Sequence, residues 1–496
     1  MLSVYLRDVQ LIDGTGASAY LASVLIQAGL IARIDRDDSV ETTAGLPAGT
    51  QVIEANGLAL APGFIDVHTH DDAFVLERAP TGQYHAKLSQ GVTTVITGNC
   101  GVSVAPLVHA DPPAPLNILG FGVYHYETFS DYLKAVAQSA PVVNVGCLVG
   151  HTTLRIKHVK DLNAEATQNE TALMAGEVRS AMQAGALGLS TGVYYPPARA
   201  ASTQEIAALC VPLASYHAPV TMHLRNESDE IDAAMQEAFE IGKTAGCTVV
   251  LSHHKLIGAQ NAGRSQETLA TIDAVQSGQE VCLDCYPYDA SSTMLFIDRV
   301  EQSREVQITW SGAIPGAAGR LLSDLAKEHD CTLVAMASKL LPAGAIYFAM
   351  DEADVQRILT HPLTMIGSDG ISNDANPHPR LWGSFTRVLG RYSRDLKLFP
   401  LEAAVHKMTG LSARRFGLDR ATKARPARGQ IALGWAADLV LFDPKQVADQ
   451  ASFDDPRLPS IGIHYVFVNG VMAAQNGLTV NPSAGVLLRN HLTDQQ

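Results

Sequence analysis

Short apolar runs alternate with longer amphipathic segments through most of this 496-residue chain. Eight such runs follow one another: GFIDVHTH, VTTVITGNC, VVNVGCLVGH, ALGLSTGVY, VTMHLR, TVVLSHHK, EVCLDCYPY and TMIGSDG. Helix-like stretches follow several of them, such as SDEIDAAMQEAFEIGKTAG after the fifth run and RSQETLATIDAVQSG after the sixth. Buried strands that alternate with helices form parallel sheets. Eight units predict an α/β chain built on a closed (β/α)8 TIM barrel over residues 62–420, with an open doubly wound sheet as the alternative.

Both ends of the chain carry strand-like segments without helical periodicity. Residues 1–61 contain SVYLRDVQLI, ASVLIQAGLIARI and TQVIEANGLAL, and residues 421–480 contain GQIALGWAADLVLFDP and HYVFVNGVMAAQNG. The last two segments resemble hairpins, and Asn469-Gly470 is a turn signal in the second of them. We expect the two ends to form one small β-sandwich domain together.

A long segment interrupts the alternation between the seventh and eighth apolar runs. It covers residues 289–350. Loops longer than about 15 residues in compact domains are usually functional or carry structure of their own. This segment follows a barrel strand, so we expect an insertion that covers the face where barrel active sites form.

The composition is that of a globular enzyme, with 47% hydrophobic and 17% charged residues. The net charge of -14 disfavours nucleic acid, because phosphate backbones attract clustered Lys and Arg. The opening MLSVYLRDVQLIDG lacks the apolar region of a signal peptide, and no apolar run reaches the ~18 residues of a membrane span. We therefore expect a cytoplasmic protein that binds neither nucleic acid nor a membrane.

The seven cysteines are odd in number and scattered, unlike the dense even pattern of a disulfide scaffold. Reduced thiols are therefore expected. Cys282 and Cys285 have the spacing of a redox or zinc motif, but they lie within an apolar run without a second such pair, so we assign them to core packing.

His68-Thr69-His70, at the end of the first run, is the strongest chemical signal in the sequence. Residues two apart in a strand face the same side, so both imidazoles are expected to point into the barrel near its C-terminal mouth. Such a pair can chelate a metal ion. An HxH triplet is often a chance occurrence, but here APGFID precedes it and places it at a strand end.

Cys100, His223 and His253 lie at or near the ends of the second, fifth and sixth runs. Zn²⁺ accepts thiolate and imidazole ligands together, and a catalytic site leaves one position open for water. The alternatives are a buried core thiol for Cys100 and hydrogen-bonded structural roles for the histidines. His253 and His254 are adjacent and face opposite sides of a strand, so at most one of them enters the barrel.

Asp369, in MIGSDG at the end of the last run, is the best candidate for a general base. A carboxylate at a barrel mouth can reach a water on the metal. The alternative is a turn or helix-capping aspartate before Gly370.

The residues described so far carry a resemblance that covers the chain from end to end. APGFIDVHTH, the single histidines of the fifth and sixth runs, GSDG and the closing GWAADLVLFD resemble the amidohydrolase superfamily. Within it the chain looks like the N-acyl-D-amino-acid deacylase, or D-aminoacylase, group. The motifs specific to that group are GVTTVITGNCG, LVGHTTLR, STGVYYPP, SHHK followed by GRS, and CYPYDASST.

The resemblance implies hydrolysis of the amide bond of N-acyl-D-amino acids, giving a carboxylate and a free D-amino acid. It implies a tightly held zinc on Cys100, His223 and His253, and a second, weaker metal site on His68 and His70 with Cys100. It also favours His253 over His254. Asp369 would take a proton from the attacking water and return it to the departing amine.

The same resemblance implies a set of substrate contacts. Lys255, Tyr286 and Arg380 would hold the α-carboxylate, and a tyrosine of Tyr194-Tyr195 would contact the scissile carbonyl. Ser292, in CYPYDASST, is a further candidate for substrate binding.

Two of these contacts also have a rationale in the residues themselves. A guanidinium such as that of Arg380 binds carboxylate through two parallel hydrogen bonds, although the residue could equally be a surface arginine of a loop. Lys255 follows His253 by two residues, so in a strand it shares the face of that histidine.

Arg299, in the insertion, is a candidate for pairing with an acidic side chain of the substrate. It would favour N-acyl-D-glutamate or N-acyl-D-aspartate, whereas an apolar residue at this position would favour neutral substrates. The alternative is a solvent-facing arginine beside Asp298.

Two rival functions remain at this point. A cyclic-amide hydrolase of the dihydropyrimidinase type would use a bridging lysine, and no candidate lies near Cys100 or in the fourth run. A non-catalytic barrel scaffold would have lost its metal ligands, but every expected ligand is present. Neither the acyl group nor the oligomeric state follows from the sequence.

Overall fold

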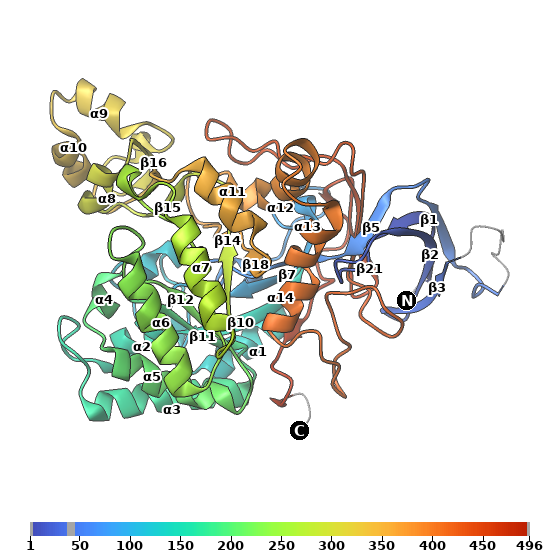
Figure 1. The fold of residues 1–496 in the computed structure, drawn as a ribbon, viewed down its shortest axis with the longest axis horizontal. Helices are drawn as coiled ribbons and strands as arrows, with labels where there is room; N and C mark the ends of the chain where they lie inside the picture. Colours follow the sequence, from blue (N-terminus) through green and yellow to red (C-terminus); the bar gives the residue numbers. More distant parts are fainter. Residues whose placement is uncertain (1–2, 37–44, 494–496) are drawn as a thin grey trace.

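The computed structural model describes residues 3–36 and 45–493. Parallel strands form its centre (Figure 1). There are eight of them, and they pair in the order in which they follow one another in the chain. They are β6 (Phe64–Asp66), β7 (Val92–Thr97), β10 (Asn144–Gly150), β11 (Gly188–Gly192), β12 (Val220–His223), β13 (Val249–Leu251), β14 (Val281–Cys285) and β18 (Thr364–Ile366). Each of the eight predicted runs contains one of these strands.

The barrel closes between its last and first strands. Thr69 and Gly370 form a parallel bridge, and the amide of Asp369 donates to the carbonyl of His68 at 2.8 Å. The predicted closed barrel is therefore confirmed, and the open doubly wound alternative is wrong. Every residue of β7, β10 and β12 is buried, as expected for strands covered by side chains inside the barrel and by helices outside it.

Helices form the outer layer of the barrel (Figure 1). They are α1 (Phe129–Ser139), α2 (His151–His158), α3 (Gln168–Ala184), α4 (Pro196–Arg199), α5 (Thr203–Ala214), α6 (Ile231–Ala245), α7 (Ser265–Gln276), α11 (Glu352–Thr360), α12 (Arg380–Arg387), α13 (Leu401–Met408) and α14 (Gly410–Arg415). Helix α3 begins with a capping box in which Thr167 and Glu170 satisfy each other's backbone amides. The two helices predicted after the fifth and sixth runs are α6 and α7. Between β6 and β7 only two short 3₁₀ turns occur, η1 (Phe74–Leu76) and η2 (Leu88–Gln90).

The two ends of the chain share one further sheet, seen at the right of Figure 1. Its strands are β1 (Val4–Leu11), β2 (Tyr20–Gln27), β3 (Leu30–Asp35), β4 (Gln51–Glu54), β5 (Ala59–Pro62), β19 (Leu439–Phe442), β20 (Ile463–Val468), β21 (Val471–Gln475) and β22 (Leu478–Thr479). The N-terminal and C-terminal parts meet where β5 pairs antiparallel with β19. The outer strand β3 bonds back to the segment before β19, where the amide of Ile31 donates to the carbonyl of Trp435 at 2.9 Å. The sheet thus curls around its own apolar core, as a small β-sandwich does.

One of the two predicted hairpins is correct and the other is wrong. Strands β20 and β21 are joined by Asn469 and Gly470, both with the positive φ that such a two-residue turn requires. GQIALGWAADLVLFDP forms only the single strand β19, because its partners come from β5 and β20. The limits 1–61, 62–420 and 421–480 stay predictions.

The segment after the seventh strand has a fold of its own. It contains the antiparallel sheet β15 (Ser291–Met294), β17 (Ala343–Phe348) and β16 (Glu305–Ser311), with helices α8 (Ile297–Gln302), α9 (Leu322–Glu328) and α10 (Leu333–Leu340). A separate apolar core holds these elements together. In Figure 1 the segment lies beyond the arrowhead of β14, at the C-terminal end of the barrel. Among the described residues, no helix is long and apolar enough to cross a membrane.

Candidate metal centre

The predicted metal ligands lie just beyond the ends of the barrel strands. β6 ends at Asp66, so His68 and His70 do not lie in the strand, and strand alternation is the wrong reason for their common direction. Three of the chemically important residues instead adopt left-handed backbone conformations, with φ of 55° at Cys100, 37° at His253 and 49° at Asp369. Such angles are uncommon for residues other than glycine and often occur at functional sites.

Three donor atoms meet at the mouth of the barrel. The Sγ atom of Cys100 lies 3.2 Å from Nε2 of His253, which lies 2.9 Å from Nδ1 of His223. All three side chains are buried, and their donor atoms lie within 4.8 Å of one another. Burial alone raises the pKa of Cys100, but the nearby His68 and His253 outweigh it and hold that pKa well below its ordinary value. A thiolate and two imidazoles that face one common point fit Zn²⁺.

A second group of donors shares Cys100 with the first. His68 Nε2 lies 3.2 Å from Cys100 Sγ, and His70 Nε2 lies 3.2 Å from Oδ1 of Asp369. His68 Nε2 is also 3.5 Å from the same carboxylate oxygen. These four residues could hold a second cation beside the first.

His254 points away from this centre. Its Nε2 lies 2.9 Å from Oγ1 of Thr268 on α7, and burial lowers its pKa to about 4. The choice between His253 and His254 is therefore made at the end of β13, where the chain has already left the strand.

Two buried carboxylates behind the ligands were missed by the sequence reasoning. Asp284, on β14, lies 3.2 Å from Nδ1 of His68 and accepts the backbone amide of His253 at 2.8 Å. Glu227, in the loop after β12, lies 3.1 Å from Nδ1 of His253. Carboxylates that accept from Nδ1 fix the tautomer that presents Nε2 to a metal. The only sequence signals were an acidic residue inside an apolar strand and one four residues after His223.

Glu227 also connects the barrel to the insertion. Its carboxylate accepts hydrogen bonds from Lys255 Nζ and, at 3.1 Å, from Nη2 of Arg299. Burial raises the pKa of Glu227, but Lys255 and the two histidines hold it well below its ordinary value, so the group is an anion. Lys255 does share the surroundings of His253, with 2.7 Å between Nζ and Nδ1, but neither residue is in a strand, and the predicted reason was wrong.

Asp369 forms an ion pair on the other side of the site. Its Oδ2 lies 2.8 Å from Nη1 of Arg380, whose Nη2 donates to the carbonyl of Ser292 at 3.0 Å. Burial alone raises the pKa of Asp369, but Arg380, His68 and the hydrogen bond from His70 hold it well below its ordinary value. Arg380 is fully buried, so the alternative of a surface arginine is wrong.

Three tyrosines lie in or next to this region. Tyr195 Oη lies 3.1 Å from Oγ1 of Thr293, and its ring centroid is 5.0 Å from that of His223. Tyr194 Oη accepts from Nε of Arg299 at 3.0 Å. The hydroxyl of Tyr286 is buried without a hydrogen-bond partner among the described residues.

One cavity brings most of the predicted site residues together. Those that line it are His70, Cys100, Tyr195, His223, His253, Lys255, Tyr286, Ser292, Arg299 and Asp369. His68, Tyr194 and Arg380 stand behind this layer and contact Cys100, Arg299 and Asp369 respectively. Arg299 is 4% exposed, so the alternative of a solvent-facing arginine is wrong.

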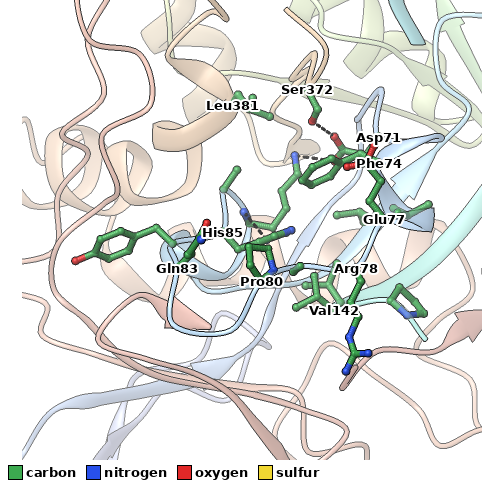
Figure 2. Close-up of a pocket in the computed structure, with 18 of the residues that line it drawn as sticks. Asp71, Phe74, Glu77, Arg78, Pro80, Gln83, His85, Val142, Ser372 and Leu381 are labelled. Atoms are coloured by element: carbon green, nitrogen blue, oxygen red, sulfur yellow. Dashed lines mark hydrogen bonds and ion pairs between the residues drawn. The ribbon is translucent and has the colours of Figure 1, made fainter. Parts of the chain in front are cut away.

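A second cavity lies outside the barrel, where the first βα unit lacks an α-helix (Figure 2). Asp71 lines this cavity; its carboxylate accepts from Ser372 Oγ at 2.6 Å and pairs with Lys87 Nζ at 3.1 Å. Lys87 also donates to Asp66 at 2.9 Å and to Ser368 at 3.1 Å. This network joins the end of β6 to the end of β18 and so supports the loops that carry the two histidines and Asp369.

A closed parallel barrel with imidazole, thiolate and carboxylate groups at its C-terminal mouth defines the class of metal-dependent barrel hydrolases. The comparison with known families agrees with this class. Residues 51–309 and 325–474 match the model described as "Amidohydrolase family". The chain belongs to the amidohydrolase family, and the resemblance inferred from its motifs is confirmed.

Three curated relatives, all from Alcaligenes xylosoxydans xylosoxydans, match nearly the whole chain. A D-aminoacylase is 48% identical over 96% of both chains. An N-acyl-D-aspartate deacylase is 48% identical over 93% of this chain and 89% of its own. An N-acyl-D-glutamate deacylase is 44% identical over 95% and 93%.

Solved structures give the same result. A D-aminoacylase structure superposes with a TM-score of 0.91 at 47% identity and covers 98% of this chain and 99% of its own. The N-acyl-D-glutamate deacylase of Bordetella bronchiseptica, solved with zinc and a phosphonate that mimics the tetrahedral intermediate, has the same TM-score and coverage at 43% identity. The L-hydantoinase of Arthrobacter aurescens, at 16% identity and a TM-score of 0.60, shares the fold alone.

Proposed function

We propose that this enzyme hydrolyses N-acyl-D-amino acids with zinc and releases a carboxylate and a free D-amino acid. The observation that carries the proposal is the cavity in which the Cys100, His223 and His253 donors face the Asp369–Arg380 ion pair. The activities named for relatives of 44–48% identity support the same reaction.

Cys100, His223 and His253 would hold the tightly bound zinc, and His68 and His70 would share Cys100 in a weaker second site. Bound zinc is a Lewis acid that polarises a carbonyl and brings the ionisation of water to about pH 7. Glu227 and Asp284 orient the imidazoles through their Nδ1 atoms and backbone.

Asp369 would act as the proton carrier. It is ionised in the free enzyme, so it can accept the proton of the attacking water, and it then donates that proton to the nitrogen of the departing amine. Tyr195, whose ring lies beside that of His223, would donate a hydrogen bond to the oxygen that gains charge during the attack.

Lys255, Arg380 and Tyr286 would hold the α-carboxylate. The free hydroxyl of Tyr286 and the cations that flank its ring, with Lys255 Nζ 6.0 Å and the Arg380 guanidinium 4.5 Å from its centroid, support this assignment. Ser292 would contribute to substrate binding through its backbone more than through its side chain. Its carbonyl accepts from Arg380 and so positions that side chain, whereas its hydroxyl donates to the carbonyl of Ala345.

Arg299 would select an acidic side chain, either D-glutamate or D-aspartate. It lines the cavity, and it shares the single carboxylate of Glu227 with Lys255, so positive charge remains on this wall. A substrate with a second carboxylate would satisfy that charge.

The test measures amine release by the zinc-loaded protein from N-acetyl-D and N-acetyl-L forms of Glu, Asp, Leu and Met. We expect selective release from D-Glu or D-Asp, and we expect Arg299→Met to lower the ratio of kcat/KM for D-Glu over D-Leu at least about tenfold. Arg304→Met is the matched control, because Arg304 lies in the same insertion but pairs with Asp289 on the surface.

Three other outcomes would reject all or part of the proposal. Release from D-Leu or D-Met only would keep the reaction and reject the role of Arg299. No turnover of any D-substrate with zinc bound would reject the proposed reaction and favour cyclic amides, although β11 carries no lysine. Absence of bound metal would favour the scaffold reading.

A further inference from the structure

A further polar pocket, separate from the catalytic cavity and from the cavity of Figure 2, lies at the opposite end of the barrel from the metal centre. It has a volume of about 510 Å³. The loops that lead into β13 and β14 line it together with the end of α14, so it opens at the N-terminal end of the strands. We call it the basal pocket and define it by Lys243, Gln279, Glu280, Arg414, Arg415 and Arg420.

Positive charge collects in this pocket. Four of its six defining side chains are cations, and the only carboxylate is that of Glu280, 4.0 Å from Arg415. The side chains of Lys243, Arg414 and Arg420 form no hydrogen bond or ion pair with any residue of 3–36 or 45–493. The whole chain carries a net charge of -14, so a cluster of uncompensated cations runs against its overall balance.

Two buried donors in the pocket lack acceptors. Nε of Arg415 and the side-chain amide nitrogen of Gln279 have no hydrogen-bond partner among the described residues. Among the residues that line the pocket, all buried side-chain acceptors have a hydrogen-bond partner, so only donors are left unpaired. Buried donors without acceptors are costly. A ligand that relieves this cost must therefore supply acceptor oxygens.

Two histidines, His217 and His491, lie next to these cations, and the pKa of His491 is affected by them. His491 lies beside Arg420, and its ring centroid is 6.2 Å from that of His217, which lines the pocket. Burial first, and then the charges of Arg420, His217 and Arg425, lower the pKa of His491.

Interaction with helix dipoles explains part of this arrangement. Lys243 lies in the last turn of α6, and Arg414 and Arg415 lie in the last turn of α14, where cations are favourable. Dipoles do not explain Arg420, which lies beyond α14, or the two donors without acceptors. An anionic ligand would supply the acceptors and the negative charge that these features lack.

We infer that the basal pocket binds a small phosphate-bearing molecule. Guanidinium groups bind phosphate through paired, charge-assisted hydrogen bonds, and a phosphate dianion matches several cations better than a single carboxylate does. The volume lies within the range of about 300–1,000 Å³ that is usual for small-molecule sites, and it exceeds the need of a bare ion. The site lies at the opposite end of the barrel from the catalytic cavity, so its ligand does not compete with substrate.

The test compares inorganic phosphate with glycerol phosphate, and potassium chloride of equal ionic strength is the salt control. Thermal unfolding and calorimetric titration of the zinc-loaded protein are measured with each probe. We expect both phosphates to raise the unfolding midpoint with concentration beyond the effect of chloride. We also expect glycerol phosphate to bind more tightly than inorganic phosphate.

Variants separate this site from the metal centre, which could also take phosphate. Arg414→Gln with Arg420→Gln should weaken binding of glycerol phosphate at least about tenfold. Arg7→Gln with Arg36→Gln makes the same change in net charge, in β1 and just after β3, and should leave binding unchanged. Lys243→Gln changes one exposed residue of the pocket, on α6, and should also weaken binding of glycerol phosphate.

Three results would overturn the proposal. One is equal binding by the pocket variants and the control variants, which places the phosphate elsewhere. Another is a midpoint shift no greater than that in chloride. The third is a single-stranded oligonucleotide that binds more tightly than glycerol phosphate and loses its affinity in the pocket variants, which makes the surface a nucleic-acid site.

Discussion

At the scale of single residues, the metal centre depends on side chains that the local backbone conformation directs toward the mouth of the barrel. Cys100, His253 and Asp369 all have positive φ, and each lies a few residues beyond a barrel strand. A residue with positive φ interrupts the alternation of side-chain directions that a strand imposes, so its side chain can point across the C-terminal mouth of the barrel. The surrounding hydrogen bonds hold these strained conformations, for example the bond from the amide of His253 to Asp284.

Replacement of Asp369 by Asn tests the role of the carboxylate. Because the ligand donors of Cys100, His223 and His253 remain, we expect the tightly bound zinc to be retained. We expect kcat to fall by about 10²–10⁴, the usual contribution of general acid–base catalysis. Metal analysis and steady-state kinetics measure the two effects, and a variant with near-normal kcat would reject the assignment.

Replacement of Glu227 by Gln removes the charge that His253, Lys255 and Arg299 share. Loss of a carboxylate behind a metal ligand typically lowers metal affinity or activity by about 10–100-fold. We expect faster loss of zinc to a chelator. We also expect a lower KM for N-acetyl-D-glutamate, because Lys255 and Arg299 lose their counter-charge.

Glu205→Gln is the matched control for this variant. Glu205 is also a buried glutamate with histidine and arginine partners, but it does not line the catalytic cavity. Zinc retention should stay normal in the control. Equal loss of zinc in both variants would mean that Glu227 acts only through general stability.

At the scale of elements, buried ion pairs tie the helices of the outer layer to one another. Glu205 of α5 binds Arg155 of α2 through both carboxylate oxygens and lies 2.9 Å from Nε2 of His151. His151, at the end of the third apolar run, therefore has a structural role. Lys87 joins β6 to β18 in the same manner on the other side of the barrel.

The Glu205 network predicts a pH-dependent stability. Burial raises the pKa of Glu205, but His151 and Arg155 outweigh it and lower the pKa from 4.5 to about 2. A depressed pKa stabilises the fold above about pH 4.5, by about 3 kcal/mol, and this stabilisation is lost as the pH falls toward 2. Glu205→Gln should therefore lower the unfolding midpoint at pH 7, and its difference from the wild type should shrink below pH 4.5. A constant difference across that range would contradict this account.

At the scale of the whole molecule, the metal centre joins parts of the barrel that are far apart in the chain. The three donors of the first cluster come from the ends of β7, β12 and β13, and Cys100 also contacts His68 beyond β6. The insertion adds Arg299 and Ser292 to the same cavity. A ligand bound there stabilises the native state in which all these segments meet.

Removal of zinc by a chelator should abolish activity and lower the unfolding midpoint. Added zinc should restore both in the wild type. Cys100→Ser should respond to neither treatment, because both candidate sites share that thiolate. Differential scanning calorimetry with metal analysis measures the effect. A midpoint that does not depend on zinc would show that the metal is not bound at a buried site.

The sequence by itself determined the barrel, its eight strands and the sheet shared by the chain ends. Periodicity, turn residues and the HxH triplet are local signals, because they follow from which side chains lie near each other along one strand or turn. The family motifs added the ligand set. The same signals failed for GQIALGWAADLVLFDP, where strand-like composition did not specify whether the partner strand was a neighbour in sequence.

Only the tertiary structure decided how the site is assembled. The family motifs favoured His253 over His254, but the physical reason is a backbone turn beyond β13, and the roles of Glu227 and Asp284 depend on atoms brought together from different strands. The pairing of Arg299 with Glu227 likewise joins the insertion to the barrel. Sequence patterns record the neighbours of a residue along the chain, whereas charge, pKa and ligand geometry depend on its neighbours in space.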